Sequence, residues 1–267
     1  RRGAQPLYVG RRVALFAATA ALTALGAREM YNVVDVGGVT TLEWAMLALF
    51  VALFAWVAFS FLTALAGFFV VLFGARAGLV IELPSPPLTS RTAMLLPTYN
   101  EDPHHVTARW RAMWEAVEAT GQGERFDWYL LSDTTDPDVW VEEEAAFREL
   151  RAACPRGVYY RHRADNYARK SGNIAEWIER FGAAYDHMIV LDADSLMTGD
   201  ALVGLAHAME AHPEAGLIQT APLVVNARSL FGRLQQFAGR VYGPMVIAGN
   251  AWWQGPDGNY WGHNAII

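Results

Sequence analysis

The chain has 267 residues, of which 53% are hydrophobic, and it carries a formal net charge of −6. Residues 1–82 hold six basic and four acidic side chains, whereas the rest of the chain holds 15 basic and 23 acidic ones. An acidic polar part without clustered cations excludes a nucleic acid as partner. The single cysteine, Cys154, excludes an internal disulfide and a cysteine-rich zinc site, as expected in a reducing compartment.

Two apolar runs at the start of the chain predict membrane helices. The first, residues 13–27, follows Arg11 and Arg12 and predicts a span over about 12–31. A signal peptide is the alternative for this run, although no small-x-small cleavage site precedes Arg28. The second run has no charged residue from Trp44 to Ala75. As a helix it would be ~48 Å long, which predicts a span over about 44–66.

The distribution of arginines predicts the orientation of these spans. Four arginines precede the first span, and Arg76 and Arg91 follow the second, whereas the loop between them is acidic overall. By the positive-inside rule, both the N-terminus and everything after residue 76 lie in the cytoplasm. We therefore expect a multi-pass protein of the bacterial inner (cytoplasmic) membrane, with the lipid bilayer as a partner and a cytoplasmic catalytic domain.

The remainder of the chain predicts alternating strands and helices. Residues 83–91 read as a Pro/Ser linker between a membrane region, 1–82, and a domain over 92–267. Short apolar runs indicate strands at 92–96, 126–131, 158–161, 188–191 and 217–219, and helical patterns lie between them at 104–119, 138–153, 171–183 and 199–211. Such alternation is typical of a mostly parallel sheet with helices on both faces. Ligands bind beyond the carboxyl ends of the strands in such sheets, which is where the polar clusters fall.

Asp192 and Asp194 carry the strongest chemical signal. They lie one residue apart where a buried strand ends, and their carboxylates could converge on one hard cation such as Mg²⁺ or Mn²⁺. The simpler interpretation is that Asp194 caps the following helix. Phosphotransferases of the haloacid dehalogenase type also use Asp-x-Asp, but on the first strand of their domain, whereas this pair follows the fourth.

Three further motifs follow other strands. Thr98, Tyr99 and Glu101 lie in a turn that could stack and hydrogen-bond a base, or could simply cap the next helix. Asp133 ends the second strand, where a carboxylate could accept a hydrogen bond from a uracil ring N–H. Lys170 lies in a run, RKSGN, whose free helix-start amides offer a phosphate seat, or which forms an ordinary basic helix start.

Other residues have simpler predicted roles. His104 and His105 are adjacent on a helix and point apart, so we expect them to be solvated rather than metal ligands. Trp110 and Trp114 are spaced as core residues of the same helix. Two alternatives stay open for Trp252 and Trp253, which could stack on a sugar or pack a helix at the membrane interface.

Taken in order, the segments LLPTYNEDP, LSDTTDP, RKSGN, IVLDADS, IQTAP and YWGHNAII resemble the family 2 glycosyltransferases, which include cellulose and hyaluronan synthases. Within the family, SDTTDP, YYRHRADNYARKSGN and WGHNAII point to the bacterial inner-membrane enzymes of osmoregulated periplasmic glucan synthesis. The resemblance covers about residues 92–267. It implies an α/β, Rossmann-like, mostly parallel domain of the GT-A fold, truncated here and preceded by two transmembrane helices.

The resemblance also implies a function, which is the inverting, metal-dependent transfer of glucose from UDP-glucose to a growing β-glucan acceptor. Asp133 would contact the uracil, and Thr98, Tyr99 and Glu101 would line the nucleoside pocket. Lys170 would reach the diphosphate, and Asp192 would lie at the donor. Mg²⁺ or Mn²⁺ would be held by Asp192 and Asp194, with Asp194 as the expected direct ligand. The acceptor side would comprise Gln219, Thr220, Trp261, Gly262, His263 and Asn264.

The resemblance places the general base on an aspartate downstream of Ile267, so we expect a donor site without a catalytic base and no turnover by these residues alone. Other glucan-biosynthesis proteins are expected as partners of the longer protein. Two alternatives remain at this point. One is another family 2 polysaccharide synthase, similar to cellulose or hyaluronan synthase, and the other is a nucleotide-sugar-binding module without chemistry of its own.

Overall fold

The computed structural model describes residues 6–75, 78–79 and 86–267, which belong to two compact units. One unit, residues up to 80 together with 222–259, is helical, and the other, 81–221 with 260–267, contains the sheet. The helices are α1 (Pro6–Val34), α2 (Thr41–Leu72), α3 (Pro103–Ala119), α4 (Pro137–Ala153), α5 (Arg169–Phe181), α6 (Gly199–Ala211) and α7 (Leu230–Gln254), with short 3₁₀ turns η1 (Gly123–Arg125) and η2 (Gly182–Ala184). The strands are β1 (Thr92–Thr98), β2 (Phe126–Ser132), β3 (Val158–His162), β4 (His187–Val190), β5 (Ile218–Gln219) and β6 (Ala265–Ile266).

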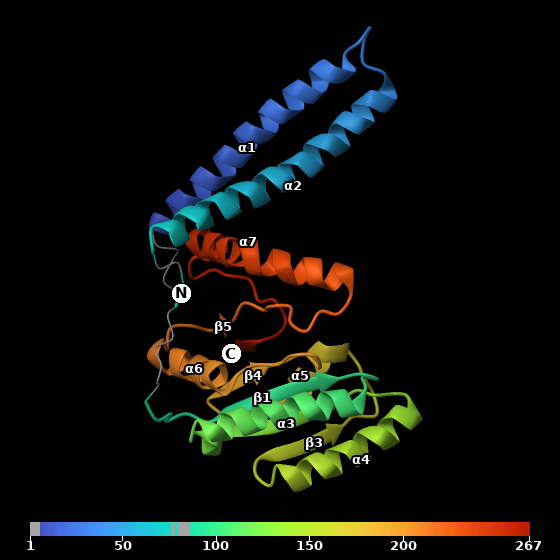
Figure 1. The fold of residues 1–267 in the computed structure, drawn as a ribbon, viewed down its shortest axis with the longest axis vertical. Coiled ribbons are helices and arrows are strands. Elements are labelled where there is room, and N and C mark those ends of the chain that lie inside the picture. The colour runs from blue at the N-terminus through green and yellow to red at the C-terminus, as the bar shows by residue number, and fades with distance from the viewer. Residues whose placement is uncertain (1–5, 76–77, 80–85) are drawn as a thin grey trace. The chain divides into compact units, whose positions relative to one another are not determined.

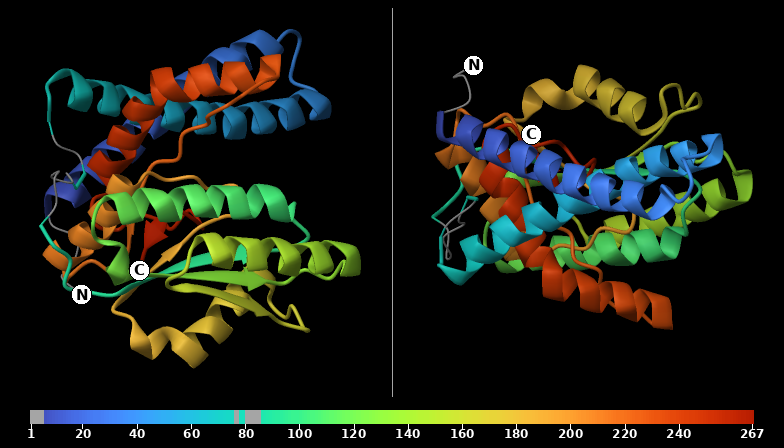
Figure 2. Two further views of the ribbon diagram at one scale, coloured as in Figure 1. Left: turned by 60° about the horizontal axis from the view of Figure 1, so that its bottom comes forward. Right: turned by 90° about the horizontal axis from the view of Figure 1, so that it is seen from above.

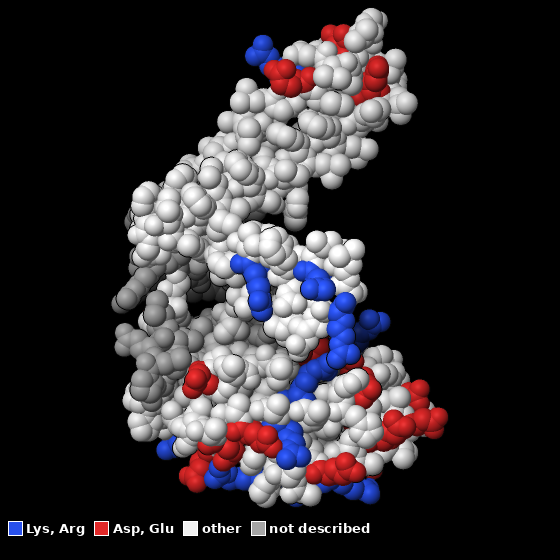
Figure 3. Space-filling view, in the orientation of Figure 1, with Lys and Arg blue, Asp and Glu red and all other residues white. Residues whose placement is uncertain are grey.

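Helices α1 and α2 form a hairpin within the helical unit (Figure 1). Among the described residues, these are the two helices long and apolar enough to cross a membrane, and they contain both predicted spans. A capping box starts α2, because the Thr40 hydroxyl accepts from the Glu43 amide at 3.4 Å while the Glu43 carboxylate accepts from the Thr40 amide at 2.7 Å. Charged side chains lie near the connecting end of the hairpin, and its shaft is uncharged on the face seen in Figure 3.

The helical unit also includes α7, which the sequence patterns did not predict. The predicted domain of 92–267 is therefore interrupted, because residues 222–259 group with α1 and α2. Glycines allow this packing: a Cβ added at Gly67 on α2 would lie 1.7 Å from the Met245 carbonyl oxygen, and one added at Gly249 on α7 would lie 2.1 Å from the Thr63 carbonyl oxygen. Without side chains at these two positions, the backbones of α2 and α7 meet directly.

Trp252 and Trp253 serve helix packing in this unit. The Trp253 ring contacts the rings of Phe16 and Phe59 edge-on, with centroids 6.1 and 5.7 Å away. Arg11 donates to the Trp252 carbonyl at 3.1 Å and lies over its ring. Of the two alternatives for these tryptophans, the contacts favour helix packing over sugar stacking.

The second unit is built on a six-stranded sheet with the order β3-β2-β1-β4-β6-β5. Strands β3, β2, β1 and β4 are parallel, and β6 pairs antiparallel with both β4 and β5. The predicted fold class, a mostly parallel α/β sheet preceded by two apolar helices, is confirmed. The last predicted strand, 217–219, corresponds to β5. It pairs antiparallel with β6, which lies between β5 and β4.

Helices cover both faces of this sheet (Figure 2). Side chains of β1 alternate between the faces, so that Met94 and Leu96 pack with α3, α4 and α6, whereas Ala93 and Leu95 pack with α5. Trp110 is 1% exposed and Trp114 packs partly buried against the same core, as predicted. Cys154 is buried and free, and burial raises the pKa of its thiol to about 11.

The predicted helix starts are confirmed at α3 and α4. The Asp102 carboxylate accepts from the His104 and His105 amides at 2.9 and 3.0 Å, and Pro103 occupies the first turn. Asp136 caps α4 in the same way, and Pro137 occupies the first turn of that helix. His104 and His105 are exposed, as expected of residues that begin a surface helix.

The described part of the predicted linker, residues 86–91, is anchored rather than free; residues 83–85 lie outside the described residues. Leu88 is 2% exposed and belongs to the core, and its amide donates to Gln122 at 2.6 Å. The Glu210 carboxylate on α6 accepts from the Thr89 and Ser90 amides at 2.8 and 2.7 Å. The two prolines and the serine of this segment predict a linker, but Gln122 and Glu210 accept hydrogen bonds from its backbone amides.

Candidate functional site

The predicted donor residues gather at the carboxyl edge of the parallel strands. Thr98 ends β1, Asp133 directly follows β2, and Asp192 lies two residues after β4. Because β1 pairs with both β2 and β4, these three strand ends lie side by side. The amide of Asp133 donates to the Thr98 carbonyl at 2.9 Å, which ties the first two ends together.

Asp133 is held by an arginine that the sequence patterns did not single out. Its carboxylate is buried, and it receives two hydrogen bonds from the guanidinium of Arg163, the second at 2.8 Å. The hydrogen bonds to Asp133 raise the pKa of Arg163. Arg163 also donates to the Arg169 carbonyl at 2.8 Å, directly before Lys170. A bidentate pair fixes the plane of the Asp133 carboxylate and leaves further lone pairs on its oxygens to accept from a ligand.

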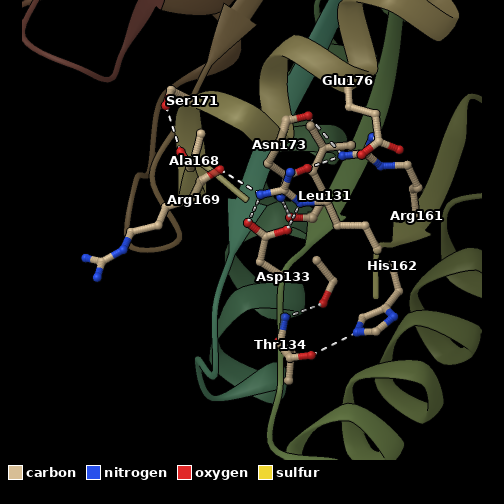
Figure 4. A network of polar contacts seen from close by, with 12 residues as sticks. Leu131, Asp133, Thr134, Arg161, His162, Ala168, Arg169, Ser171, Asn173 and Glu176 are labelled. Atoms are coloured by element: carbon tan, nitrogen blue, oxygen red, sulfur yellow. Dashed lines mark hydrogen bonds and ion pairs between the residues drawn. The ribbon is translucent and has the colours of Figure 1, made fainter. Parts of the chain in front are cut away.

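A second set of contacts supports this pair (Figure 4). Asn173 is fully buried, donates to the Leu131 carbonyl at 2.9 Å and accepts from Arg161. Burial lowers the pKa of Arg161, which also lies 3.4 Å from the carboxylate of Glu176. These contacts attach α5 to the ends of β2 and β3, so that the helix carrying Lys170 has a defined position relative to Asp133.

Thr98 contributes to a buried cluster around Glu143 of α4. The Glu143 carboxylate, 3% exposed, accepts from the hydroxyls of Thr98 and Thr134 at 3.2 Å each and from Tyr160 at 2.9 Å. Burial, together with the Glu143 carboxylate, raises the pKa of Tyr160. The Thr98 hydroxyl therefore faces the protein interior, where it positions the ends of β1 and β2 rather than lining an open surface.

The turn after β1 is connected to the turn after β2 by Asn100. This residue has a positive φ of 52°, and its side-chain oxygen accepts from the Thr135 and Asp136 amides at 3.0 and 3.1 Å. Tyr99 is 53% exposed, with its hydroxyl 3.4 Å from that of Thr135, and Glu101 is exposed. The ring of Tyr99 is therefore open to a stacking partner at this edge.

Lys170 lies at the start of α5 and reaches the end of β4. Its ammonium group forms an ion pair with Asp192 and donates to the Gly262 carbonyl at 2.8 Å. The helix begins at Arg169, directly after Ala168; both residues have positive φ, and no side chain caps its N-terminus among the described residues. Gly172 is required here, because a Cβ would lie 2.1 Å from the Tyr167 carbonyl oxygen. A lysine and uncapped amides together favour an anion at this position.

The predicted acceptor-side residues meet the aspartate turn. The Ser195 hydroxyl accepts from the Asp192 amide at 2.9 Å and donates to the Asn264 side chain at 2.8 Å. The Asn264 carbonyl accepts from the Thr220 amide at 3.0 Å, and the Trp261 amide donates to the Gln219 side chain at 3.0 Å. Trp261 is 41% exposed and His263 is half-buried. Gly262 therefore contacts Lys170, and Asn264 contacts the aspartate turn; the acceptor-side role of these residues stays a prediction.

Asp194 is exposed, and it lies in the same turn as Asp192. Within the described ranges, no group of three or more His, Cys, Asp or Glu side chains is placed to hold a metal ion. The turn offers two carboxylates, and Mg²⁺ is commonly bound by one or two protein carboxylates with phosphate and water oxygens at its other positions. Burial and the charge of Asp192 raise the pKa of Tyr260.

Sequence reasoning missed two central residues, Arg163 and Glu143. Arg163 belongs to a basic run directly after β3, so its position at the carboxyl edge of the sheet was a usable signal. Glu143 occurs with Ala146, Phe147 and Leu150 on the buried stripe of α4, where a carboxylate at an inward position indicates buried hydroxyl partners.

Comparison with known proteins identifies relatives over nearly the whole chain. No protein-family model matches it. The chain is 68% identical over 260 residues to glucans biosynthesis glucosyltransferase H of Bradyrhizobium diazoefficiens, 60% identical over 259 residues to that of Rhodopseudomonas palustris strain BisA53, and 51% identical over 264 residues to that of Xanthomonas euvesicatoria. Each match covers 96% of this chain, which spans 35%, 36% and 40% of the respective relatives.

Among solved structures, a mannosyltransferase from Pyrobaculum calidifontis in complex with GDP-Man and Mn²⁺ aligns with a TM-score of 0.40 and 17% identity, over 62% of this chain and 47% of that one. The sequence matches are far higher in identity and confirm the resemblance read from the motifs. Over the length that they share, the chain belongs to the family of proteins named glucans biosynthesis glucosyltransferase H.

Proposed function

We propose that the sheet-containing unit binds UDP-glucose together with a divalent cation, and that it forms the donor half of a membrane-anchored glucosyltransferase that extends a β-glucan. The observation that carries the proposal is the continuous set of contacts from Asp133 through Arg163 to the start of α5, and from Lys170 to Asp192 and Gly262. It connects a buried, oriented carboxylate to a lysine and to Asp192, which lies two residues before Asp194, at one edge of the sheet.

Each part of the donor has a matching group. The ring N–H of uracil can donate a hydrogen bond to a carboxylate oxygen of Asp133. The exposed ring of Tyr99 can stack on the base. Lys170 and the free amides of α5 suit the diphosphate. Asp192 and Asp194 would hold Mg²⁺ or Mn²⁺, which when bound neutralises charge on the departing diphosphate.

Lys170 has a second role in this proposal. It is paired with Asp192, and the pair is only partly buried, at 38% and 39% side-chain exposure. A diphosphate would compete for the ammonium group and thereby free Asp192 for the metal. Donor and metal binding should then be mutually dependent. We propose that the acceptor hydroxyl is deprotonated by a residue of the longer protein, as the resemblance implies.

The direct test is calorimetry of UDP binding to this 267-residue chain in detergent, with and without Mn²⁺ or Mg²⁺. We expect the metal to strengthen UDP binding at least about tenfold, which corresponds to ~1.4 kcal/mol. Asp194→Asn should remove that increase, whereas Asp200→Asn, which changes an exposed aspartate at the start of α6, should not. The proposal fails if the folded chain binds no UDP at millimolar concentration, or if Asp194→Asn responds to metal as the unaltered chain does.

Competition between UDP-sugars separates the proposed donor from those of related synthases. UDP-glucose should displace UDP more effectively than UDP-N-acetylglucosamine or UDP-glucuronate. Preference for either of the latter would assign the chain to a synthase of another polymer. Incorporation of labelled glucose by the longer protein, abolished by Lys170→Met, would distinguish a transferase from a module that only binds nucleotide sugars.

A further inference from the structure

We propose that Glu143 is a positioning residue for base recognition, because its carboxylate holds the two turns that carry Tyr99 and Asp133. This inference deepens the donor site and rests on the function proposed above. It concerns a side chain that would not touch the nucleotide, since Glu143 is 3% exposed and lies behind the hydroxyls of two strand ends.

Glu143 is buried without a basic partner. Its oxygens accept from the hydroxyls of Thr98, Thr134 and Tyr160 at 3.2, 3.2 and 2.9 Å. Among the residues that the structure describes, no basic side chain forms an ion pair with it. A carboxylate buried in this way is costly compared with a well-packed apolar side chain. Its place on the buried stripe of α4 therefore indicates a role besides packing.

Two of the three hydroxyls belong to residues directly next to the proposed base contacts. Thr98 ends β1 and precedes Tyr99, and Thr134 follows Asp133 after the end of β2. Both hydroxyls donate to the same oxygen of Glu143. One carboxylate oxygen therefore fixes the distance between the turn that carries the stacking ring and the turn that carries the hydrogen-bonding carboxylate.

Thr134 is also held by contacts that do not involve Glu143. Its amide donates to the Ser132 hydroxyl at 3.2 Å, and its carbonyl oxygen lies 2.8 Å from a ring nitrogen of His162 (Figure 4). Its hydroxyl accepts from the Asn100 amide at 3.2 Å. Loss of the contact with Glu143 should therefore leave the turns folded but less firmly placed relative to each other.

Base selectivity is the property that depends on this placement. The ring N–H of uracil can donate to Asp133, whereas the same ring position of cytosine carries a lone pair, and an ionised carboxylate can accept but not donate. A site that hydrogen-bonds one ligand discriminates strongly against an analogue that lacks the donor. This discrimination requires the Asp133 carboxylate to lie in the plane of the base that Tyr99 stacks, and Glu143 sets that relation.

The ratio of the CDP to the UDP dissociation constant tests this inference, because the two nucleotides carry the same diphosphate. Calorimetry of the 267-residue chain in detergent with Mn²⁺ measures both constants. We expect a ratio of at least about ten for the unaltered chain. Glu143→Leu removes the acceptor and should lower the ratio at least about threefold, whereas Glu143→Gln keeps a carbonyl oxygen for the hydroxyls and should retain most of it. Equal ratios for these two variants would overturn the inference.

A second pair of variants separates positioning from stability, and it serves also if Glu143→Leu does not fold. Thr134→Val and Tyr160→Phe each remove one hydrogen bond from the Glu143 carboxylate, but Tyr160 lies on β3 and is adjacent in the chain to neither Tyr99 nor Asp133. We expect both variants to lower the midpoint of thermal unfolding. Thr134→Val should also lower the nucleotide ratio, whereas Tyr160→Phe should keep it. An equal loss of the ratio in both would overturn the inference, because the effect would then follow stability.

The remaining outcomes distinguish this inference from the proposed function. If the unaltered chain prefers UDP and folded Thr134→Val prefers it as strongly, the inference is overturned and the proposed function stands. If the unaltered chain binds UDP and CDP equally, base recognition by Asp133 and its positioning by Glu143 are both overturned. If it binds neither nucleotide, the proposed function fails, and this inference fails with it.

Discussion

At the scale of single residues, Asp133 and Arg163 form an ion pair that is shielded from water. Both side chains are more than nine-tenths buried, so each depends on the other for its hydrogen bonds. Arg163→Met would leave the Asp133 carboxylate buried without a countercharge, a loss that typically costs ~3–5 kcal/mol. We expect a lower midpoint of thermal unfolding and no detectable UDP binding.

Two variants make this prediction specific. Arg163→Lys keeps the charge but lacks the planar fork, so it should recover part of the stability and little of the UDP affinity. Arg148→Met removes an exposed arginine that lies 3.6 Å from Glu144, a pair worth at most ~1 kcal/mol. Equal unfolding midpoints for Arg163→Met and Arg148→Met would contradict the role given to the buried pair.

The same residues show what the sequence could predict about the site. Asp133, Lys170 and Asp192 were predictable because each follows a strand or opens a helix, and strand ends of a parallel sheet converge. Arg163 and Glu143 could be noted from their positions, but their partners could not be named, because these lie 30 and 45 residues away and are selected by the register of β2 with β1 and β3. Thr98 was placed at the correct strand end, but its hydroxyl faces Glu143, since the side-chain direction depends on the packing of α4.

At the scale of elements, predictions succeeded where local chemistry marks the ends. Asp-Pro pairs begin α3 and α4, and both helices were predicted to within one residue at their starts. Helix α7 was missed because arginines, four glycines and Pro244 interrupt its apolar residues, and its stability comes from packing on α2. Strand β6 has two residues, too few for any periodicity, and it exists because β4 and β5 hold it between them.

The contact of α2 with α7 predicts a sharp difference between two glycines. Gly67→Ala would force a Cβ against the Met245 carbonyl and should destabilise the helical unit by about 1–3 kcal/mol or more. Gly239→Ala has nothing within 4 Å and should be neutral or stabilising by up to ~1 kcal/mol through helix propensity. Thermal unfolding followed by tryptophan fluorescence measures both, since Trp252 and Trp253 pack in this unit. A destabilising Gly239→Ala with a neutral Gly67→Ala would exclude the close crossing.

The anchoring of residues 86–91 on α6 predicts a dependence of stability on pH. Burial alone would raise the pKa of Glu210, but the hydrogen bonds from Ser90 and Thr89 outweigh it and lower the pKa from 4.5 to about 2. A folded-state pKa below the unfolded one means that the stabilisation is fully present above about pH 4.5 and is lost as the pH falls toward 2. We therefore expect the unfolding midpoint of Glu210→Gln to fall less than that of the unaltered chain over this range.

A matched substitution checks this dependence. Glu149→Gln on α4 removes an exposed carboxylate and should leave the acid response of the unfolding midpoint unchanged. If Glu149→Gln and Glu210→Gln reduce the acid response equally, then general charge, and not the anchoring of residues 86–91, controls it.

At the scale of the whole molecule, the central prediction concerns which side of the membrane each part occupies. The α1/α2 hairpin has both of its open ends on one side, so the loop between the helices must lie on the other side if the hairpin spans. That loop region carries Arg28 against Glu29, Asp35 and Glu43, whereas Arg11 and Arg12 lie toward the opposite end of α1. The positive-inside rule then places Val36 outside the cytoplasm and the sheet-containing unit, with its donor site, in the cytoplasm where nucleotide sugars are made.

Thiol labelling of intact bacterial cells measures this arrangement directly. Val36→Cys and Tyr167→Cys introduce thiols at positions that are 84 and 80% exposed in the folded chain, and the native Cys154 is buried, with a thiol pKa of about 11 that keeps it protonated and unreactive. A maleimide that cannot cross membranes should label Val36→Cys in intact cells and Tyr167→Cys only after permeabilisation. Labelling of Tyr167→Cys in intact cells would place the candidate donor site on the side without nucleotide sugars and would contradict the proposed function. Labelling of neither until permeabilisation would show instead that the hairpin does not cross the bilayer, in which case the apolar faces of α1 and α2 must be buried against protein.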